Sequence, residues 1–443
     1  MEKNRYSVAL ICLGCDKNRV DSEVMLARLK EDGFEIISDV SNADLIIVNT
    51  CGFLEDARKE SLDWVLKANG LKKEGARIMV TGCMAQRYGK ELYKYLTEAH
   101  AIANAQNEDI AVKARECLNS GERLYYKTQD MRSLEEGERF LSTPSHYAYL
   151  KIADGCNNYC SYCLIPSIRG RYRSRTMESV LKEAENLVKK GVKELIIVAQ
   201  DVTKYGFDLY NQYALVDLLK ALVKLDGLWK IRLLYCYPET VSNELLRFIS
   251  SEQKIAKYID IPLQHVSDGI LCAMNRKSSG ESIKILFDKL KNNYPQIALR
   301  STFICGFPAE SQEDFDELKD FLKSYKLTNA GFFAFSREKG TRAYSLPNQI
   351  AQKVKVQRQK ELYALQSEIS LENNKRLVGK TFEAIVDSFD ADSGKFYCRT
   401  EFQAPDIDGV CLVDNNFSIN IGDIIKIKII NYDNYDLTGE ITL

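Results

Sequence analysis

Short apolar runs alternate with helical stretches through the first hundred residues. Strands that alternate with helices in this way predict a parallel sheet covered on both faces. We therefore expect an open α/β domain over residues 1–106. Its predicted elements are strands at Ser7–Leu13, Asp44–Val48 and Arg77–Thr81, and a first helix at Glu23–Glu31 with Asp21 and Ser22 as its cap.

The pattern lapses over residues 107–145, which contain Gly121, Gly137 and Pro144. We interpret this stretch as a connection between domains, with one strand at Arg123–Lys127.

The central part of the chain repeats a strand-then-helix unit six times. Eight such units close a barrel, so six predict an open, partial barrel. Helical sequence between about Ala351 and Arg376 ends this domain, which we assign to residues 146–376. The predicted strands are Tyr147–Ala153, Glu194–Ala199, Lys230–Cys236, Tyr258–Leu263, Leu299–Cys305 and Gly331–Phe335.

The tail, residues 377–443, has a different pattern. Runs rich in β-branched residues, such as Thr381–Val386 and Asp423–Ile430, are separated by regularly spaced glycines. This pattern is typical of a small antiparallel β-barrel in the size range of oligonucleotide-binding modules.

Composition narrows the class of protein. The chain has 443 residues, of which 45% are hydrophobic and 28% charged, as in soluble globular proteins with several domains. A net charge of −1 gives no global case for nucleic-acid binding. No run approaches the roughly 20 apolar residues that span a bilayer, and the apolar run near the start lacks a cleavage site. We expect a cytoplasmic protein whose 13 cysteines stay reduced and serve metals or catalysis.

The most specific motif follows the first barrel strand. Cys156, Cys160 and Cys163 have the spacing Cys-x3-Cys-x2-Cys. A closed iron–sulfur cluster takes four cysteines, so three leave one iron open, and S-adenosylmethionine can chelate such an iron. A structural zinc loop is the alternative, but it needs a fourth ligand and the chain has only three histidines.

This motif, with the aromatic Tyr162 and the six β/α units, resembles the radical S-adenosylmethionine superfamily. The resemblance implies that Tyr162 lies against the adenine of the cofactor and that other contacts come from the carboxyl ends of barrel strands. The candidates at those ends are Gln200, Asp201, Gln264, Thr302 and Gly306. A glycine at position 306 would let the backbone approach a ligand closely.

A second set of three cysteines lies in the first domain. Cys15, Cys51 and Cys83 each follow an apolar strand, and such strand ends share one edge of a parallel sheet. We therefore predict a second three-cysteine cluster, whose open iron could hold an exogenous sulfur. Cys12 is expected to be a core residue, because its odd separation from Cys15 points the two side chains to opposite faces.

Two open clusters and a small β-barrel resemble the methylthiotransferase family, whose tail module is of the type called TRAM. Membership implies two 4Fe-4S clusters, S-adenosylmethionine as radical source and methyl donor, and an electron donor. One branch modifies an adenosine of tRNA; the other modifies the β-carbon of an aspartate in ribosomal protein S-twelve. The stretches Leu13–Glu23, Asp260–His265 and Ala404–Gly409 resemble the second branch, whereas Ala309 stands where the family commonly has glycine.

Charge is consistent with the second branch. From Lys375 to the end there are seven basic and twelve acidic residues, a balance of −5. An acidic module suits a basic partner, such as a ribosomal protein free or in the small subunit, better than it suits tRNA. The alternative is that these acids only confer solubility. The use of four alternating arginines stays open: Arg169, Arg171, Arg173 and Arg175. A non-catalytic metal- or redox-responsive module is the rival from another class.

Overall fold

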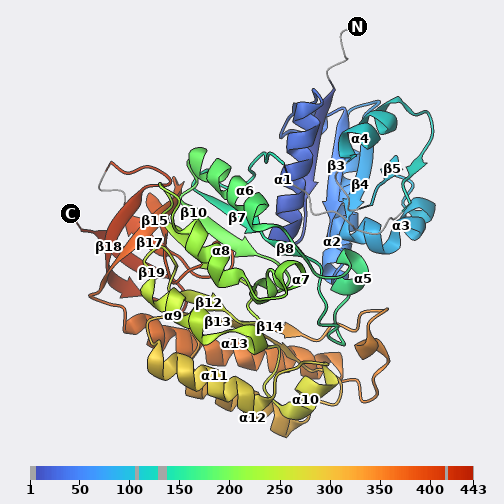
Figure 1. Cartoon of the computed structure of the whole chain (residues 1–443). Helices are drawn as coiled ribbons and strands as arrows, with labels where there is room; N and C mark the ends of the chain where they lie inside the picture. The colour runs from blue at the N-terminus through green and yellow to red at the C-terminus, as the bar shows by residue number, and fades with distance from the viewer. Residues whose placement is uncertain (1–5, 105–108, 128–136, 415–417, 443) are drawn as a thin grey trace. The chain divides into compact units, whose positions relative to one another are not determined.

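The computed structural model describes residues 6–104, 109–127, 137–414 and 418–442, and Figure 1 shows the course of the chain. The boundary predicted at residue 106 lies outside the described residues. The chain forms two compact units. Unit 1 contains the described residues of Met1–Ser142, Tyr149–Tyr159 and Cys163–Glu183; unit 2 contains those of Thr143–Ala148, Cys160–Tyr162 and Ala184–Leu443.

Unit 1 is built on a six-stranded parallel sheet, as the alternating pattern predicts. Each strand is paired in parallel with its neighbours, so the carboxyl ends of all the strands lie at one edge. The strand order is β2 (Glu35–Ile36), β1 (Ser7–Cys12), β3 (Leu45–Thr50), β4 (Arg77–Gly82), β5 (Ala101–Ile102) and β6 (Leu124–Tyr125).

Helices cover both faces of this sheet (Figure 1). Helices α1 (Asp16–Glu31) and α4 (Ile110–Asn119) pack on one face through apolar residues such as Leu29 and Ile110. Helices α2 (Glu55–Leu71) and α3 (Cys83–Tyr95) pack on the other through residues such as Val65 and Leu92. Strand residues alternate between the two cores, because successive side chains in a strand point to opposite faces.

Three local predictions in this unit are wrong. Helix α1 begins at Asp16, so Asp21 and Ser22 are buried within the helix and Cys15 is its N-cap. The strand predicted at Arg123–Lys127 is present as β6, but the stretch also contains α4, and β6 extends the sheet of unit 1, so it is not merely a connection between domains. Cys12 ends β1 as an exposed residue and is not part of the core.

Unit 2 holds five of the six strands of the predicted partial barrel and the first two residues of the sixth, β7 (Tyr147–Lys151). They form two parallel sheets, and the amide of Cys236 donates to the carbonyl of Asp260 where the sheets meet. The first sheet has the order β11 (Lys230–Leu233), β10 (Glu194–Val198) and β7. The second has the order β12 (Tyr258–Asp260), β13 (Ala298–Cys305) and β14 (Asn329–Ala334).

Helices follow the strands, as the repeated strand-then-helix unit predicts. Two of them begin with reciprocal capping boxes, at Ser279 and Ser311, which satisfy the first free amides of each helix. The helices are α6 (Met177–Lys189), α7 (Phe207–Tyr210), α8 (Leu215–Leu222), α9 (Asn243–Ser251), α10 (Asp268–Ala273), α11 (Gly280–Asn293), α12 (Gln312–Tyr325) and α13 (Gln352–Lys375). No described helix combines the length and the apolar character needed to cross a membrane.

The tail forms a closed five-stranded barrel with its own apolar core, which includes Phe396, Cys398 and Ile427. The sheet is not wholly antiparallel, because β17 and β19 pair in parallel. The strands are β15 (Thr381–Asp390), β16 (Lys395–Thr400), β17 (Cys411–Asp414), β18 (Ile424–Tyr432) and β19 (Leu437–Ile441).

Several acids of the tail contact other parts of unit 2. Asp387 accepts a hydrogen bond from Arg399, which also pairs with Glu194 of β10 at 2.7 Å. Asp408 accepts from the Tyr258 hydroxyl of β12 at 2.8 Å. Glu383 and Glu401 likewise pair with Trp229 and Lys230. Four of the twelve tail acids therefore hold the barrel in place, which reduces the charge left for a basic partner.

Candidate functional site

The first set of cysteines lies at the carboxyl edge of the sheet in unit 1. Cys51 follows β3 directly, and Cys83 follows β4 as the first residue of α3. Cys15 follows β1 after a two-residue turn and caps α1. Strands β1, β3 and β4 are neighbours in the sheet, so the three residues come together although 68 positions separate Cys15 from Cys83.

The thiols of this set are close enough to influence one another electrostatically. Burial raises the pKa of Cys83 to about 11, and the charges of Cys15 and Cys51 act in the same direction. The loops between them are tight. A Cβ atom on Gly14 would lie 2.9 Å from the Cys51 Cβ and 3.2 Å from its sulfur, and one on Gly52 would lie 2.7 Å from the Cys83 carbonyl oxygen.

Donors surround the sulfurs of this set. The backbone amide of Phe53 hydrogen-bonds the Cys51 thiol, and the positive charge of Arg169 acts on the Cys83 thiol. Cys15 caps α1 and Cys83 is the first residue of α3, so the free backbone amides of two helix N-termini lie at these positions. Burial raises the pKa of Cys51 and of Cys83, and the donors around them can compensate the negative charge that sulfur carries when it binds a metal.

The fit to a metal depends on its type. Among the described residues, no three potential ligands lie close enough to hold a single metal ion. In a four-iron cluster, however, each cysteine binds a different iron, so three sulfurs that converge without meeting fit that group. The three thiols at one sheet edge, with donors to sulfur beside them, therefore fit such a cluster.

The second set of cysteines lies in the loop that joins β8 (Ala153–Asp154) to α5 (Ile165–Arg169). In unit 1, the Asn158 amide donates to the Cys156 sulfur and the Ile165 amide donates to the Cys163 sulfur, both at 3.4 Å. Gly155 has a φ of +78°, and a Cβ there would lie 2.1 Å from the Arg171 carbonyl oxygen, so only glycine fits. Amide donors to sulfur are typical of protein-bound iron–sulfur clusters.

The remaining cysteine of this loop, Cys160, belongs to unit 2. Its sulfur lies 4.0 Å from Nη1 of the buried Arg276, whose Nη2 donates to the Pro262 carbonyl at 3.0 Å. The Arg276 guanidinium also lies 4.4 Å from the centre of the Tyr237 ring. No sequence pattern points to Arg276, because it stands in an ordinary loop after α10.

The candidates for the cofactor lie in unit 2. Tyr162 is partly buried and packs against an apolar cluster that includes Phe307 and Phe335. Gln200 and Asp201 follow β10; Asp201 is buried, with its carboxylate bonded to the Thr203 hydroxyl at 2.7 Å and to Lys204 at 3.3 Å.

Gln264 and Thr302 lie side by side. The Gln264 amide donates to the Thr302 carbonyl at 2.8 Å, and the Ile304 amide donates to the Gln264 carbonyl at 2.8 Å. Gln264 has a φ of +73°, an uncommon conformation for a residue other than glycine. Both side chains are partly exposed.

Packing against α13 restricts which residues fit in the turn after β13. A Cβ on Gly306 would lie 2.4 Å from the Lys355 side chain of α13, so this glycine is required by a helix as well as being a candidate ligand contact. Ala309, where the family commonly has glycine, has a φ of +68°.

A buried group of polar side chains supports the same turn. Glu310 accepts from Arg358 at 2.8 Å and from the Phe307 amide at 3.0 Å. His265 is fully buried, with Nδ1 accepting from the Ser267 amide at 3.1 Å and Nε2 lying 4.0 Å from Glu310. Burial lowers the pKa of His265 to about 4, so the ring is neutral.

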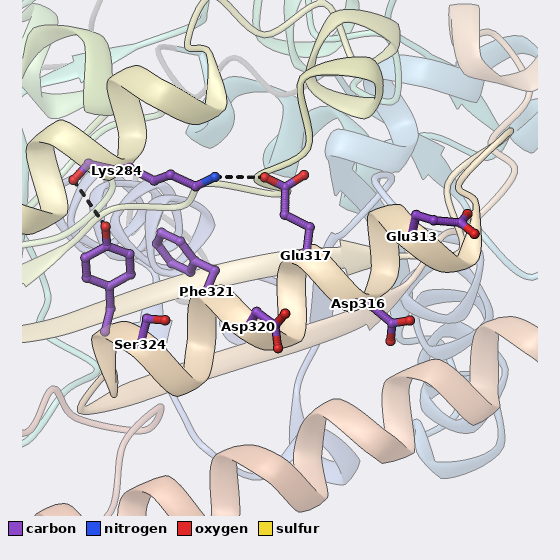
Figure 2. Close-up of a pocket in the computed structure, with 8 residues that line it drawn as sticks. Lys284, Glu313, Asp316, Glu317, Asp320, Phe321 and Ser324 are labelled. Carbon is purple, nitrogen blue, oxygen red and sulfur yellow. Dashed lines mark hydrogen bonds and ion pairs between the residues drawn. The ribbon is translucent and has the colours of Figure 1, made fainter.

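The pocket in Figure 2 lies elsewhere, between α11 and α12. Its lining is acidic, and one of these acids, Glu317, pairs with Lys284 at 3.0 Å. It contains no cysteine and none of the candidate cofactor residues. The groove is a charged surface between two helices and does not explain the cysteine pattern.

Three family patterns match the chain in succession. Residues 7–104 match the Uncharacterized protein family UPF0004, residues 150–322 match the Radical SAM superfamily, and residues 378–442 match the TRAM domain.

Among solved structures, the chain is similar to the radical S-adenosylmethionine methyltransferase TsrM from Kitasatospora setae. The TM-score is 0.56 at 14% identity, over 85% of this chain and 79% of that one. This likeness supports the α/β fold alone.

Curated relatives cover almost the whole chain. The ribosomal protein uS12 methylthiotransferase RimO of Thermoanaerobacter sp. (strain X514) is 45% identical over 98% of this chain and 99% of its own length. The protein of the same name from Clostridium tetani is 42% identical over 99% and 98%. Full-length similarity at this level, together with the three matched domains, makes the chain an enzyme that belongs to the RimO family of radical S-adenosylmethionine methylthiotransferases.

Proposed function

We propose that this enzyme adds a methylthio group to the β-carbon of an aspartate in ribosomal protein uS12, using two 4Fe-4S clusters and S-adenosylmethionine. The observation that carries the proposal is the presence of two separate sets of three cysteines, each surrounded by donors to sulfur. The substrate is taken from the printed names of the relatives.

In this proposal Cys156, Cys160 and Cys163 hold the first cluster, and S-adenosylmethionine bound there supplies a radical that removes hydrogen from the substrate carbon. The amides of Asn158 and Ile165 stabilise the ionised sulfurs. The loop itself is anchored in unit 2, where Ser161 donates its amide to the Met274 carbonyl at 2.9 Å and its carbonyl accepts from Ala343 at 2.8 Å.

Six residues are proposed to contact S-adenosylmethionine, with different support. Tyr162 presents a partly exposed ring next to the cysteine loop. Gln264 and Thr302 are supported by their adjacent positions and partial exposure. Asp201 is held by Thr203 and Lys204, which makes it better suited to orienting the loop after β10, where Gln200 also lies, than to a direct contact. Gly306 remains a candidate through its backbone only.

Cys15, Cys51 and Cys83 hold the second, auxiliary cluster in this proposal, which would carry the sulfur that is transferred. The chain contributes three thiolates at one sheet edge and leaves no room for a side chain at Gly14 or Gly52. An electron donor is a further required partner, because the first cluster must be reduced for each radical formed.

The proposed protein substrate is basic uS12 (protein S-twelve), free or in the small ribosomal subunit. The support from charge is smaller than the sequence suggested, because four tail acids are paired within unit 2. Other acids of the tail, including Asp392 and Glu440, are exposed.

The proposal is tested with anaerobically reconstituted enzyme, reductant and S-adenosylmethionine. Purified uS12, small subunits and bulk tRNA are incubated separately, and the mass of each is measured. We expect a methylthio mass gain on uS12 or on the subunit. A gain on tRNA alone would contradict the proposed substrate and favour the other branch of the family.

Cysteine variants separate the two clusters. Cys156→Ala should abolish cleavage of S-adenosylmethionine, whereas Cys51→Ala should preserve cleavage and stop sulfur insertion. Cys117→Ala is the matched control, because Cys117 is buried in the core of unit 1 outside both sets. Intact methylthiolation by Cys51→Ala would remove the auxiliary cluster from the proposal.

A further inference from the structure

The four arginines after the cysteine loop have different environments. Arg169, the last residue of α5 (Ile165–Arg169), and Arg175 are buried, whereas Arg171 is exposed and Arg173 in β9 (Arg173–Ser174) is partly buried. They therefore do not form one basic face. Arg169 is the unusual member, because its side chain is only 2% exposed and it contacts residues from three separate segments of unit 1.

Arg169 is fixed by side chains of α1 and of the loop that precedes Cys156. Its Nη1 donates to Asp21 at 2.5 Å and to Asp154 at 3.2 Å, and its Nη2 donates to Asn18 at 3.1 Å. Asn18 and Asp21 lie in the first turns of the helix that Cys15 caps. The planar guanidinium thus ties the helix of one cysteine to the loop of the other set.

Arg169 is not the only cation that pairs with these carboxylates. The buried Lys151 also pairs with Asp21, and it lies 3.4 Å from Asp154. Two cations therefore share two carboxylates in a site closed to water, where charge interactions are stronger than at a surface.

Arg169 also lies near the auxiliary cysteines. Its positive charge acts on the thiols of Cys83 and Cys51 and lowers the pKa of both against the effect of burial. Leu164 and Ile168 of the same segment pack against Cys83 in a small buried cluster, so the approach of α5 to this cysteine is fixed by packing as well as by charge.

We propose that Arg169 is a positioning residue of the auxiliary cluster, in which its guanidinium donates to the sulfur of Cys83 and stabilises the more negative state of the cluster. Hydrogen bonds to ligand sulfurs and nearby charge set the reduction potential of iron–sulfur clusters. This inference rests on the proposed function, because it requires a cluster at Cys15, Cys51 and Cys83.

If Arg169 had only a structural role, its replacement would affect stability and not the cluster. Arg175 is the comparison for such a role. Arg175 is equally buried and donates to Glu183 at 2.5 Å, to Ser179 at 2.8 Å and to the Lys151 carbonyl at 3.0 Å. Both arginines hold the same segment of chain, but only Arg169 acts on the cysteines.

The experiment isolates the auxiliary cluster. A full-length background variant with Cys156→Ala, Cys160→Ala and Cys163→Ala is reconstituted anaerobically, and the midpoint potential of the remaining cluster is measured by a titration followed with electron paramagnetic resonance. Arg169→Gln, Arg169→Lys and Arg175→Gln are introduced into this background. The thermal unfolding midpoint of each variant is measured in parallel.

We expect Arg169→Gln to disfavour cluster reduction about tenfold, a fall of about 59 mV for a one-electron couple. Arg169→Lys should lower the potential by less, because lysine keeps the positive charge but lacks the planar, two-pronged set of guanidinium donors. Arg175→Gln should lower the unfolding midpoint without moving the potential. If Arg169→Gln yields too little folded protein, the comparison of Arg169→Lys with Arg175→Gln still decides.

The outcomes distinguish failure of the auxiliary cluster from failure of the role of Arg169. If the background variant with intact Arg169 assembles no cluster, the auxiliary site of the proposed function fails. If the cluster assembles but its potential is the same with arginine, lysine and glutamine at position 169, only the role of Arg169 is overturned. Equal shifts in the Arg169 and Arg175 variants would also overturn it.

Discussion

A single methyl group at Gly14 should disable the auxiliary cysteine site. Gly14 has a φ of +96°, and a Cβ there would lie 2.9 Å from the Cβ of Cys51. Carbon atoms prefer separations of about 3.5–4.0 Å, so the loop of Cys51 would have to move by roughly 0.6 Å or more. The left-handed backbone itself costs a residue with a side chain about 1–2 kcal/mol. Gly14→Ala therefore combines backbone strain with a displaced ligand.

Gly33→Ala separates these two effects. Gly33 has nearly the same φ, +95°, and a Cβ there would meet no atom within 4 Å. It follows α1 in the same unit. Both variants should lose a similar few degrees of thermal stability before iron is added, since 1 kcal/mol corresponds to about 2–4 °C in a unit of this size. Only Gly14→Ala should affect iron binding.

The assay is the iron and sulfide content of anaerobically reconstituted protein, with the visible absorption spectrum. The wild-type chain and Gly33→Ala should bind about eight irons, as expected for two four-iron clusters. Gly14→Ala should bind about four and still cleave S-adenosylmethionine. Full iron content in Gly14→Ala, or equal loss in Gly33→Ala, would refute the reasoning from the Gly14 contact.

Four further predictions follow from contacts in unit 2. Arg399→Met leaves the buried carboxylate of Glu194 with one partner fewer, and should destabilise unit 2 by about 3–5 kcal/mol in denaturant unfolding. Because His265 has a pKa of about 4 when folded and about 6.5 when unfolded, the unfolded chain binds more protons between these values. Acidification from pH 7 to 5 should therefore cost about 2 kcal/mol, and His265→Asn should remove this part of the pH dependence. Ala309→Gly should raise the unfolding midpoint slightly, because the relief of a positive φ exceeds the entropy cost of glycine by about 0.5–1 kcal/mol. Arg276→Gln should slow cleavage of S-adenosylmethionine and leave auxiliary iron unchanged, whereas loss of both would contradict its assignment to Cys160.

The fold was predictable because its signals are local. Each barrel strand is a short apolar run followed by helical sequence, and all six predicted strands are present. The convergence of Cys15, Cys51 and Cys83 was predictable for the same reason, since the carboxyl ends of neighbouring parallel strands share an edge. The start of α1 was not, because Asp21 and Ser22 resemble a cap in sequence but are buried in the second turn of the helix.

The charged contacts could not be predicted from the sequence. Arg169 and Asp21 are 148 positions apart, and Arg399 and Glu194 are 205 positions apart in the numbering. An alternating set of arginines therefore suggested one basic surface, while the structure divides it between buried and exposed positions. The acidic tail was misleading in the same way, because a count of charges does not reveal which acids have internal partners.

The buried arginines have different charge balances, and the difference bears on the cysteine loop. Arg169 is surrounded by carboxylates, so it is compensated whatever the state of Cys83. Among the described residues, Arg276 has no carboxylate as a hydrogen-bond partner; it donates to the Pro262 carbonyl, lies on the Tyr237 ring and approaches the Cys160 sulfur. A buried guanidinium with no hydrogen-bonded carboxylate is costly. An iron–sulfur cluster held by Cys160 would place negative charge beside this arginine, so Arg276 fits a cluster at the cysteine loop better than it fits an apolar packing role.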